Sequence, residues 1–333
     1  MIAIPLVSIL INNYNYGRFL PDAIDSALSQ TYSPLEIIVV DDGSTDDSRL
    51  LISAYGSSII PVFKENGGQA SAFNAGVAAC RGEILCFLDS DDYFYPSKVG
   101  RIVELFAGLN MATPLMVHHR LRITQEDGET PQEEFLGRTH DNPLNLAQYA
   151  RKYKFMQFAA GSTTGLAINR RMCDLLFPLP IHIKVSADDF IVYGSSLIGE
   201  LHSSGEILGA YRVHGTNRWY SRDRSKSRQY IETRDQYLNE KLKENNLPGR
   251  ISYFESMWCW RDLAAEQRWT ALFWRMLKLN IVQHDRHTLG FTYAFTYGIG
   301  RFAARRLSEK ILPAWAQQFC VKGTNPNPQS ENK

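Results

Sequence analysis

Three carboxylates follow an apolar run in the segment Ile84–Asp92. Residues 84–88 are all apolar, which suits a strand buried on both faces of a sheet. In open α/β sheets, ligands bind beyond the carboxyl ends of such strands. Asp89, Asp91 and Asp92 would repel one another there unless a cation or a proton compensates, and hard divalent ions such as Mg²⁺ prefer oxygen ligands. The pattern therefore predicts a metal-binding Asp-x-Asp, and a solvated turn that caps the helix after Pro96 is the alternative.

The elements that must position these acids lie in residues 1–110, where strand and helix patterns alternate. Strands are predicted over residues 6–11, 37–40, 59–63 and 84–88, and helices over residues 19–30, 50–54 and 69–79. Ser44, three residues before Asp47, resembles the N-cap of the second helix. The alternation predicts an α/β fold with a doubly wound, mostly parallel sheet and helices on both faces.

In such a sheet, the loops at the carboxyl ends of the strands share one edge. The polar residues expected there are Asn12, Asn13, Asp41, Asp42, residues 66–69, Asp89, Asp91 and Asp92. Simple turns do not require this many amides and acids. The arrangement indicates that one ligand contacts them all.

Four motifs at this edge resemble the family 2 inverting glycosyltransferases, which have the GT-A fold. They are Val7–Asn15, Val39–Asp46, Asn66–Gly68 and Ala79–Asp92, in the family's order and at matching spacing. The resemblance covers about residues 4–215. It implies a nucleotide-sugar-binding half over residues 1–110 and an acceptor-binding, catalytic half of the same domain over residues 111–220. One departure is Asn12, where a Pro or Thr is more usual, and this departure bears on the choice of base.

The resemblance also implies roles for single residues. Asp42 would contact a uridine, Asn12 or Asn13 would line the base pocket, and Asp89 would approach the ribose. Asp91, with Asp89 beside it, would ligate Mn²⁺ or Mg²⁺ on the diphosphate, where a cation stabilises the charge of the leaving group. The remaining implied donor-binding residues are Tyr14, Asp41, Asn66, Gly67, Gly68 and Ser90. For the Asp42 segment the alternative is a strand-to-helix turn, and for the two glycines it is a flexible turn.

A second acidic pair, Asp188 and Asp189, directly precedes an apolar helical run. The family has its catalytic carboxylate at this point, so the resemblance implies Asp189 as the general base and Asp188 as the reserve. An acidic cap of the helix is the alternative. A carboxylate can serve as a base here if the proton moves late, after the acceptor oxygen has begun to bond to the sugar carbon. A single carboxylate then implies one displacement with inversion, so that an α-linked donor gives a β-glycoside.

The middle of the chain supplies further predicted elements. Residues 115–123 resemble a strand and residues 124–140 a surface excursion, while residues 161–170 form a loop and strand that line the acceptor cleft in the family. Residues 207–214 indicate another strand. It ends at His214, which matches a family position from which a histidine reaches the metal or the diphosphate. A lone surface histidine is the alternative.

Beyond Thr216 the resemblance fades and the chain becomes helical and basic. We expect a helical C-terminal extension over residues 221–320 and a disordered tail over residues 321–333. Aromatic and basic residues gather in residues 291–312. Their mixture predicts an interfacial helix on anionic lipid, with a homodimer contact as the alternative.

Composition narrows the function classes. The net charge of +1 gives no bulk attraction to nucleic acid, and the five cysteines form no Cys-x-x-Cys pair. The N-terminus lacks a basic region before its apolar residues, and no apolar stretch reaches the roughly 18 residues of a membrane span. We therefore expect a cytoplasmic protein. The resemblance implies an enzyme of cell-envelope polysaccharide synthesis that uses a nucleotide sugar, with UDP as the expected nucleotide, and a glycan or polyprenyl-linked acceptor.

Two other function classes remain as alternatives. One is a nucleotidyltransferase or another nucleotide-binding α/β enzyme, which is disfavoured because the chain has no Gly-x-Gly-x-x-Gly and no phosphate-binding Gly-Lys-Ser/Thr loop. The other is a non-catalytic binding module of the same fold. The intact carboxylates Asp42, Asp91 and Asp189 argue against it.

Overall fold

The computed structural model describes residues 4–137, 162–217 and 228–253. Most of the expected C-terminal extension, the segment 291–312 and the tail 321–333 lie outside the described residues. Within the described part, no helix is both long enough and apolar enough to cross a bilayer.

One mixed sheet runs through the described part of the chain, in the order β3-β2-β1-β4-β8-β6-β9-β5, with β7 paired to β6. Its strands are β1 (Val7–Asn13), β2 (Leu35–Asp41), β3 (Ile60–Phe63), β4 (Ile84–Asp89), β5 (Tyr93–Phe94), β6 (Leu115–Thr124), β7 (Pro131–Leu136), β8 (Leu166–Asn169) and β9 (Glu200–Arg212). The four strands β3, β2, β1 and β4 are parallel, as the alternating pattern predicts. Beyond them the sheet is mixed, because β8 runs antiparallel to both β4 and β6.

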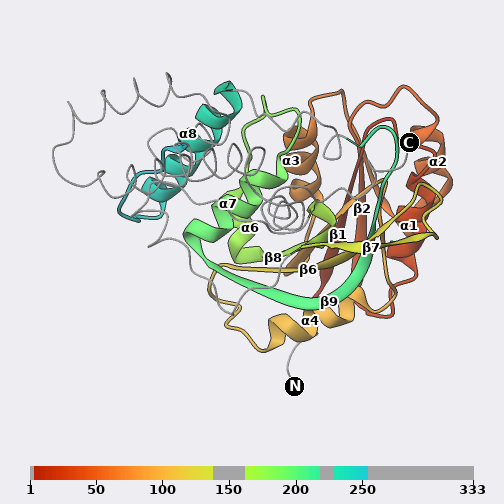
Figure 1. Ribbon diagram of the computed structural model, residues 1–333, viewed down its shortest axis with the longest axis horizontal. Helices are drawn as coiled ribbons and strands as arrows, with labels where there is room; N and C mark the ends of the chain where they lie inside the picture. The colour runs from red at the N-terminus through yellow and green to blue at the C-terminus, as the bar shows by residue number, and fades with distance from the viewer. Residues whose placement is uncertain (1–3, 138–161, 218–227, 254–333) are drawn as a thin grey trace, which may run out of the picture. The chain divides into compact units, whose positions relative to one another are not determined.

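Helices cover both faces of the sheet. They are α1 (Leu20–Leu28), α2 (Ser48–Ala54), α3 (Gln69–Ala79), α4 (Lys98–Ala107), α6 (Arg170–Leu176), α7 (Asp188–Ile198) and α8 (Arg228–Glu244). In Figure 1, α1 and α2 lie on one side of the parallel strands, and α3, α6 and α7 lie on the other. The alternation of β1 explains this: Ile9 and Ile11 pack in one core with α1 and α4, whereas Leu10 faces Gly76 of α3.

Two local features differ from what the sequence indicates. Residues 131–136, expected within a surface excursion, form the strand β7, because Asp127 accepts the N–H groups of Glu129 and Thr130 and turns the chain back onto β6. Ser44 is not an N-cap, since α2 begins only at Ser48.

The register of the parallel strands brings the polar residues together. Asn13 lies opposite Asp41 in β2, and Asn12 lies opposite Asp89 in β4. The prediction that these strand ends share one edge is therefore confirmed.

Candidate active site

Three carboxylates cluster where β4 ends. Ligand oxygens of Asp89, Asp91 and Asp92 all lie within 4.8 Å of one another. Burial, together with the charges of Asp91 and Asp188, raises the pKa of Asp89 to about 8. Burial and the charges of Asp91 and Asp89 also raise the pKa of Asp92 well above its usual range. The cluster is therefore short of positive charge.

Asp92 is anchored by the protein on both of its carboxylate oxygens. One accepts a hydrogen bond from Thr164 Oγ1 at 2.5 Å, and the other accepts the backbone N–H of Arg212 at 3.0 Å. The same threonine hydroxyl accepts the N–H of Asp89 at 3.2 Å. Sequence analysis missed this role of Thr164, since nothing in a threonine-rich loop marks one hydroxyl as a partner of β4.

His214 is buried, so the surface alternative for this residue is wrong. Its Nε2 lies 2.9 Å from Asp91 Oδ2, while its Nδ1 accepts the N–H of Thr216 at 3.3 Å. An imidazole that accepts at Nδ1 carries its proton on Nε2, and in that tautomer His214 donates to Asp91 Oδ2. Asn217, another residue that sequence analysis missed, packs beside the pair and directs its amide towards Asp91 Oδ2 at 3.5 Å.

The cluster fits a hard divalent cation. Its donor set is made entirely of oxygen, which Mg²⁺ and Mn²⁺ accept, and two of its carboxyls bind protons more readily than usual because no positive charge balances them. Asp89 and Asp91 would hold the ion, since the oxygens of Asp92 already have donors.

Asp42 fixes the conformation of the loop Asn66–Gly68, called here the donor loop because the resemblance implies that it binds the sugar donor. Its two carboxylate oxygens accept the N–H groups of Gly67 and Gly68 at 2.9 and 2.7 Å, and Lys64 Nζ lies 2.5 Å from the first oxygen. Asn66 returns a hydrogen bond from its side chain to the Asp42 carbonyl at 3.0 Å. The predicted uridine contact is thus a residue whose carboxylate is already engaged with the predicted glycine pair.

Gly68 is conformationally required in this loop. Its φ of 85° lies in the left-handed region, and a Cβ at this position would come within 2.6 Å of the Cα of Lys184. The close approach is made by the segment before α7, because Gln69 donates its N–H to the Lys184 carbonyl at 3.1 Å. The loop Asn66–Gly68 and the segment before α7 are therefore joined.

Three of the predicted donor-binding residues carry buried oxygen atoms without hydrogen-bond partners. Asn12 Oδ1, Asn13 Oδ1 and Ser90 Oγ have no hydrogen-bond partner among the described residues. The Asn13 amide nitrogen donates to Asp41 Oδ1 at 3.1 Å, and Arg49 pairs with the other oxygen of Asp41 at 3.0 Å. Asp41 thus braces Asn13 rather than facing a ligand.

The remaining predicted site residues lie at the end of β1 and in the first turn of α7. Tyr14 is exposed at the end of β1. Asp188 and Asp189 form the first turn of α7, as predicted. The charge of Asp188 contributes to the raised pKa of Asp89. Asp189 Oδ2 lies 2.9 Å from the hydroxyl oxygen of Tyr230. Sequence analysis placed Tyr230 only within the expected helical extension over residues 221–320.

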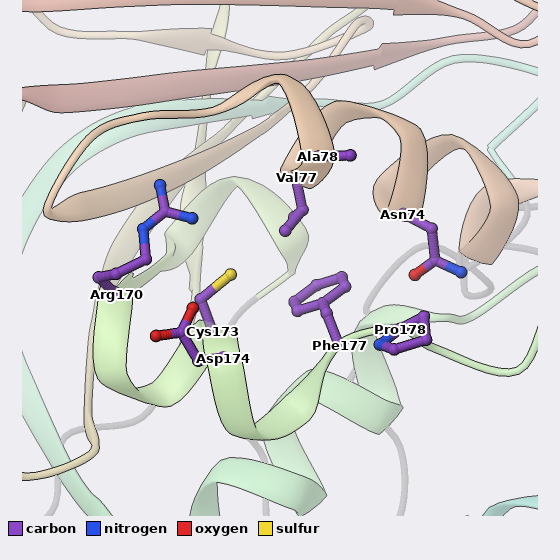
Figure 2. Close-up of a pocket in the computed structure, with 8 residues that line it drawn as sticks. All are labelled: Asn74, Val77, Ala78, Arg170, Cys173, Asp174, Phe177 and Pro178. Atoms are coloured by element: carbon purple, nitrogen blue, oxygen red, sulfur yellow. The ribbon is translucent and has the colours of Figure 1, made fainter.

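A separate pocket of about 420 Å³ lies between α3 and α6 (Figure 2). The Phe177 ring points into it below Val77. Two polar residues that line it form hydrogen bonds to the protein backbone. Asn74 hydrogen-bonds to the backbone of Leu179, and the Arg170 guanidinium donates to the carbonyls of Cys80 and Gly82. None of the predicted site residues lines this pocket.

The mixed sheet, the acidic end of β4 and the acidic first turn of α7 are the arrangement expected of a GT-A glycosyltransferase. A fragment of S. aureus TarS, solved in complex with UDP-GlcNAc, superposes with a TM-score of 0.55 over 88% of this chain and 80% of its own, at 14% identity. This likeness confirms the predicted fold.

Residues 8–172 match the family described as Glycosyl transferase family 2. A protein of a Nostoc species, described as an uncharacterized glycosyltransferase, is 37% identical over 258 residues, which are 74% of this chain and 78% of that protein. The chondroitin synthase of Pasteurella multocida is 44% identical over 106 residues, 31% of this chain and 11% of that protein. The chain belongs to glycosyltransferase family 2 and is a glycosyltransferase.

Proposed function

We propose that this enzyme is a metal-dependent inverting glycosyltransferase that moves a sugar from a nucleoside-diphosphate donor to a hydroxyl of a glycan or polyprenyl-linked acceptor. The observation that carries the proposal is the carboxylate cluster of Asp89, Asp91 and Asp92, which lies within electrostatic reach of Asp188. The description of the TarS fragment in complex with UDP-GlcNAc supports a UDP-sugar as the first donor to test. The match to chondroitin synthase supports a polysaccharide as the acceptor class, with cell-envelope synthesis as the setting.

The proposal assigns a role to each of five side chains of the site. Asp89 and Asp91 hold Mn²⁺ or Mg²⁺, and His214 orients Asp91 by donating a hydrogen bond. A bound cation supplies positive charge for the leaving diphosphate. Asn12 Oδ1 and Asn13 Oδ1 accept hydrogen bonds from the donor, which would satisfy two buried acceptors.

Asp189 is the proposed general base. It takes the proton of the acceptor hydroxyl as the new glycosidic bond forms, and the sugar is transferred once, with inversion. Asp188 lies one residue away and remains the reserve, and its nearness to Asp89 supports keeping it in the test.

The test begins with purified full-length protein and a panel of nucleotide sugars, with and without Mn²⁺. The expected result is metal-dependent release of the nucleoside diphosphate from at least one donor. Asp189→Asn keeps the size of the side chain, so donor affinity should hold within a few-fold while turnover falls by about 10²–10⁴. A loss of that size in Asp188→Asn instead would move the base by one residue. Wild-type protein that hydrolyses no donor would refute the proposal.

We also propose a cytoplasmic enzyme that contacts the membrane through residues 291–312, on the strength of the basic and aromatic sequence there. Each of the cations Arg301, Arg305, Arg306 and Lys310 near an anionic surface contributes about 1 kcal/mol, less at high salt. Binding to anionic liposomes should therefore fall as salt rises and disappear on deletion of residues 290–333. If the intact protein ignores liposomes and the deletion abolishes a dimer, the segment is an oligomer contact.

A further inference from the structure

A tyrosine from α8 reaches the first turn of α7. The hydroxyl oxygen of Tyr230 lies 2.8 Å from the carbonyl oxygen of Ser186 and 2.9 Å from Asp189 Oδ2. Its ring packs edge-on against Phe190, with the two ring centroids 5.8 Å apart. The ring contact fixes the hydroxyl beside the candidate base.

This hydroxyl has one hydrogen and two neighbouring oxygens. A carbonyl oxygen can only accept, so when Asp189 is ionised the Tyr230 hydrogen is shared between two acceptors or turned towards one of them. When Asp189 is protonated, the acid can donate to the phenol oxygen while Tyr230 donates to Ser186. Both protonation states of Asp189 therefore have a hydrogen-bonded arrangement without any movement of the heavy atoms.

Tyr230 itself keeps its proton throughout. Burial, with the negative charges of Asp189 and Asp188, raises the pKa of Tyr230 far above its usual value. The group is thus a hydrogen-bond partner for Asp189 and not a competing base.

The backbone that Tyr230 contacts also connects to the donor loop. Ser186 has a φ of 55°, which is uncommon for a residue with a side chain, and Tyr230 lies against its carbonyl. The next N–H, of Ala187, donates to Gln69 Oε1 at 2.8 Å, at the start of α3. One short turn thus links the glycine loop, the tyrosine and the base-bearing helix.

We propose that Tyr230 is a positioning residue for Asp189, whose hydroxyl orients the carboxylate before proton transfer and accepts a hydrogen bond from the carboxylic acid afterwards. The inference rests on the proposed function, because it takes Asp189 as the general base. The protons balance: one leaves the acceptor hydroxyl for Asp189, and the Tyr230 hydrogen only changes its partner from Asp189 to the Ser186 carbonyl.

Tyr230→Phe removes the hydroxyl and keeps the ring against Phe190. We expect kcat to fall about 10- to 100-fold while the KM and Kd of the donor stay within about twofold, since the hydroxyl acts on the base and not on the donor. Tyr237→Phe is the matched control. Tyr237 lies on the same helix, its ring centroid is 5.3 Å from that of Phe190, and its hydroxyl donates a hydrogen bond to the Leu176 carbonyl at 2.7 Å. The control should keep its turnover, and an equal loss in both variants would overturn the proposal.

A double variant separates positioning from an independent effect. If Tyr230 acts through Asp189, the combined Tyr230→Phe, Asp189→Asn protein should be no slower than Asp189→Asn alone. Losses that multiply would show that the hydroxyl acts elsewhere, against the proposal.

A third readout does not depend on turnover. In full-length protein with carbon-13-labelled aspartate carboxyls, the NMR signal of Asp189 is assigned by its disappearance in Asp189→Asn. It should shift in Tyr230→Phe and stay in place in Tyr237→Phe, and an unchanged signal in Tyr230→Phe would refute the positioning role. This measurement stands even if the wild-type enzyme hydrolyses no donor, which is the failure of the proposed function.

Discussion

Two clusters of like-charged groups are buried in this enzyme, an acid cluster of Asp89, Asp91 and Asp92 and a basic pair of Lys98 and His119, and their surroundings differ. At the open edge of the sheet, Asp91 and Asp92 receive hydrogen bonds from His214, Thr164 and the Arg212 backbone, which favour their charged forms. Under α4, the side chains of Lys98 and His119 are fully buried, and His119 Nδ1 lies 2.9 Å from the carbonyl oxygen of Arg120. Among the described residues, Lys98 Nζ has no oxygen acceptor and no ion pair; it lies beside the Cys86 thiol and 3.9 Å from the centre of the Phe94 ring.

Burial disfavours the charged forms of both members of the basic pair. Burial lowers the pKa of Lys98, and burial together with the Lys98 charge lowers the pKa of His119 to about 3. Lys98 is also the first residue of α4, where the helix dipole disfavours a cation. The acid cluster, with its oxygen ligands and organised hydrogen-bond donors, is thus suited to a cation, whereas the basic pair lies in a core that disfavours its charge. If this contrast holds, changes in the acid cluster should affect activity, and changes in the basic pair should affect stability.

The largest expected effect is that of Asp91→Asn. The amide keeps the shape of the side chain but is a poor metal ligand, so affinity for a nucleotide sugar in Mn²⁺ should fall on the order of 10²–10³-fold and transfer should cease. The free energy of unfolding should not fall, because the variant removes a charge that raises the pKa of both Asp89 and Asp92. Calorimetry with the nucleotide sugar and with free uridine measures this. Metal-dependent affinity equal to that of the wild type would remove Asp91 from the site.

Part of the acid cluster could be predicted from the sequence, and part could not. Parallel strands follow from alternating apolar runs, and a shared edge follows from parallel strands, so the neighbourhood of Asn13, Asp41 and Asp89 was predictable from local patterns. The donors that complete the cluster were not. Thr164 and the Arg212 backbone come from segments more than 70 residues beyond Asp92 in the chain, and their pairing depends on where the antiparallel strand β8 enters the sheet.

The basic pair was not predicted for a related reason. Lys98 begins a helix whose amphipathic pattern gives no sign that its first residue is buried, and the burial arises from packing of α4 against β6. Ser44 shows the opposite failure, since a good local N-cap signal was overridden when its hydroxyl accepted the N–H of Asn15 at 2.9 Å. In both cases tertiary contacts decided what local propensity could not.

An intermediate effect is expected for Lys98→Met. Methionine fills a similar volume without a charge that burial disfavours, so the free energy of unfolding at neutral pH should rise by about 1–3 kcal/mol, and turnover should be unchanged. Urea unfolding monitored by tryptophan fluorescence is the measurement. Lys64→Met is the control, because Lys64 is paired with Asp42 and its loss should stabilise nothing. A Lys98→Met protein less stable than wild type would mean that the buried amine has an unrecognised partner.

The smallest effect concerns pH, where the two clusters should act with opposite signs. Above pH 3.8, folded Asp89 retains a proton that the unfolded chain has lost, so its contribution to stability falls as pH rises towards about 8. Asp92 acts in the same direction. Lys98 acts in the opposite direction, because below pH 10.5 the unfolded chain binds a proton that the folded core disfavours, and stability gains as pH rises.

The two slopes can be separated between pH 6.5 and 8, where His119 is neutral in both the folded and the unfolded state over most of the window. In a chelating buffer, Lys98→Met should lose about 1 kcal/mol of stability across this window, and adding Asp89→Asn should flatten much of that slope. Mn²⁺ should flatten it as well, because a bound cation replaces the proton that the carboxyls otherwise retain. Thermal unfolding at fixed ionic strength measures all three proteins. A slope in Lys98→Met that survives both Mn²⁺ and Asp89→Asn would show that the acid cluster does not titrate as one metal-binding unit, and the contrast between the two clusters would then fail.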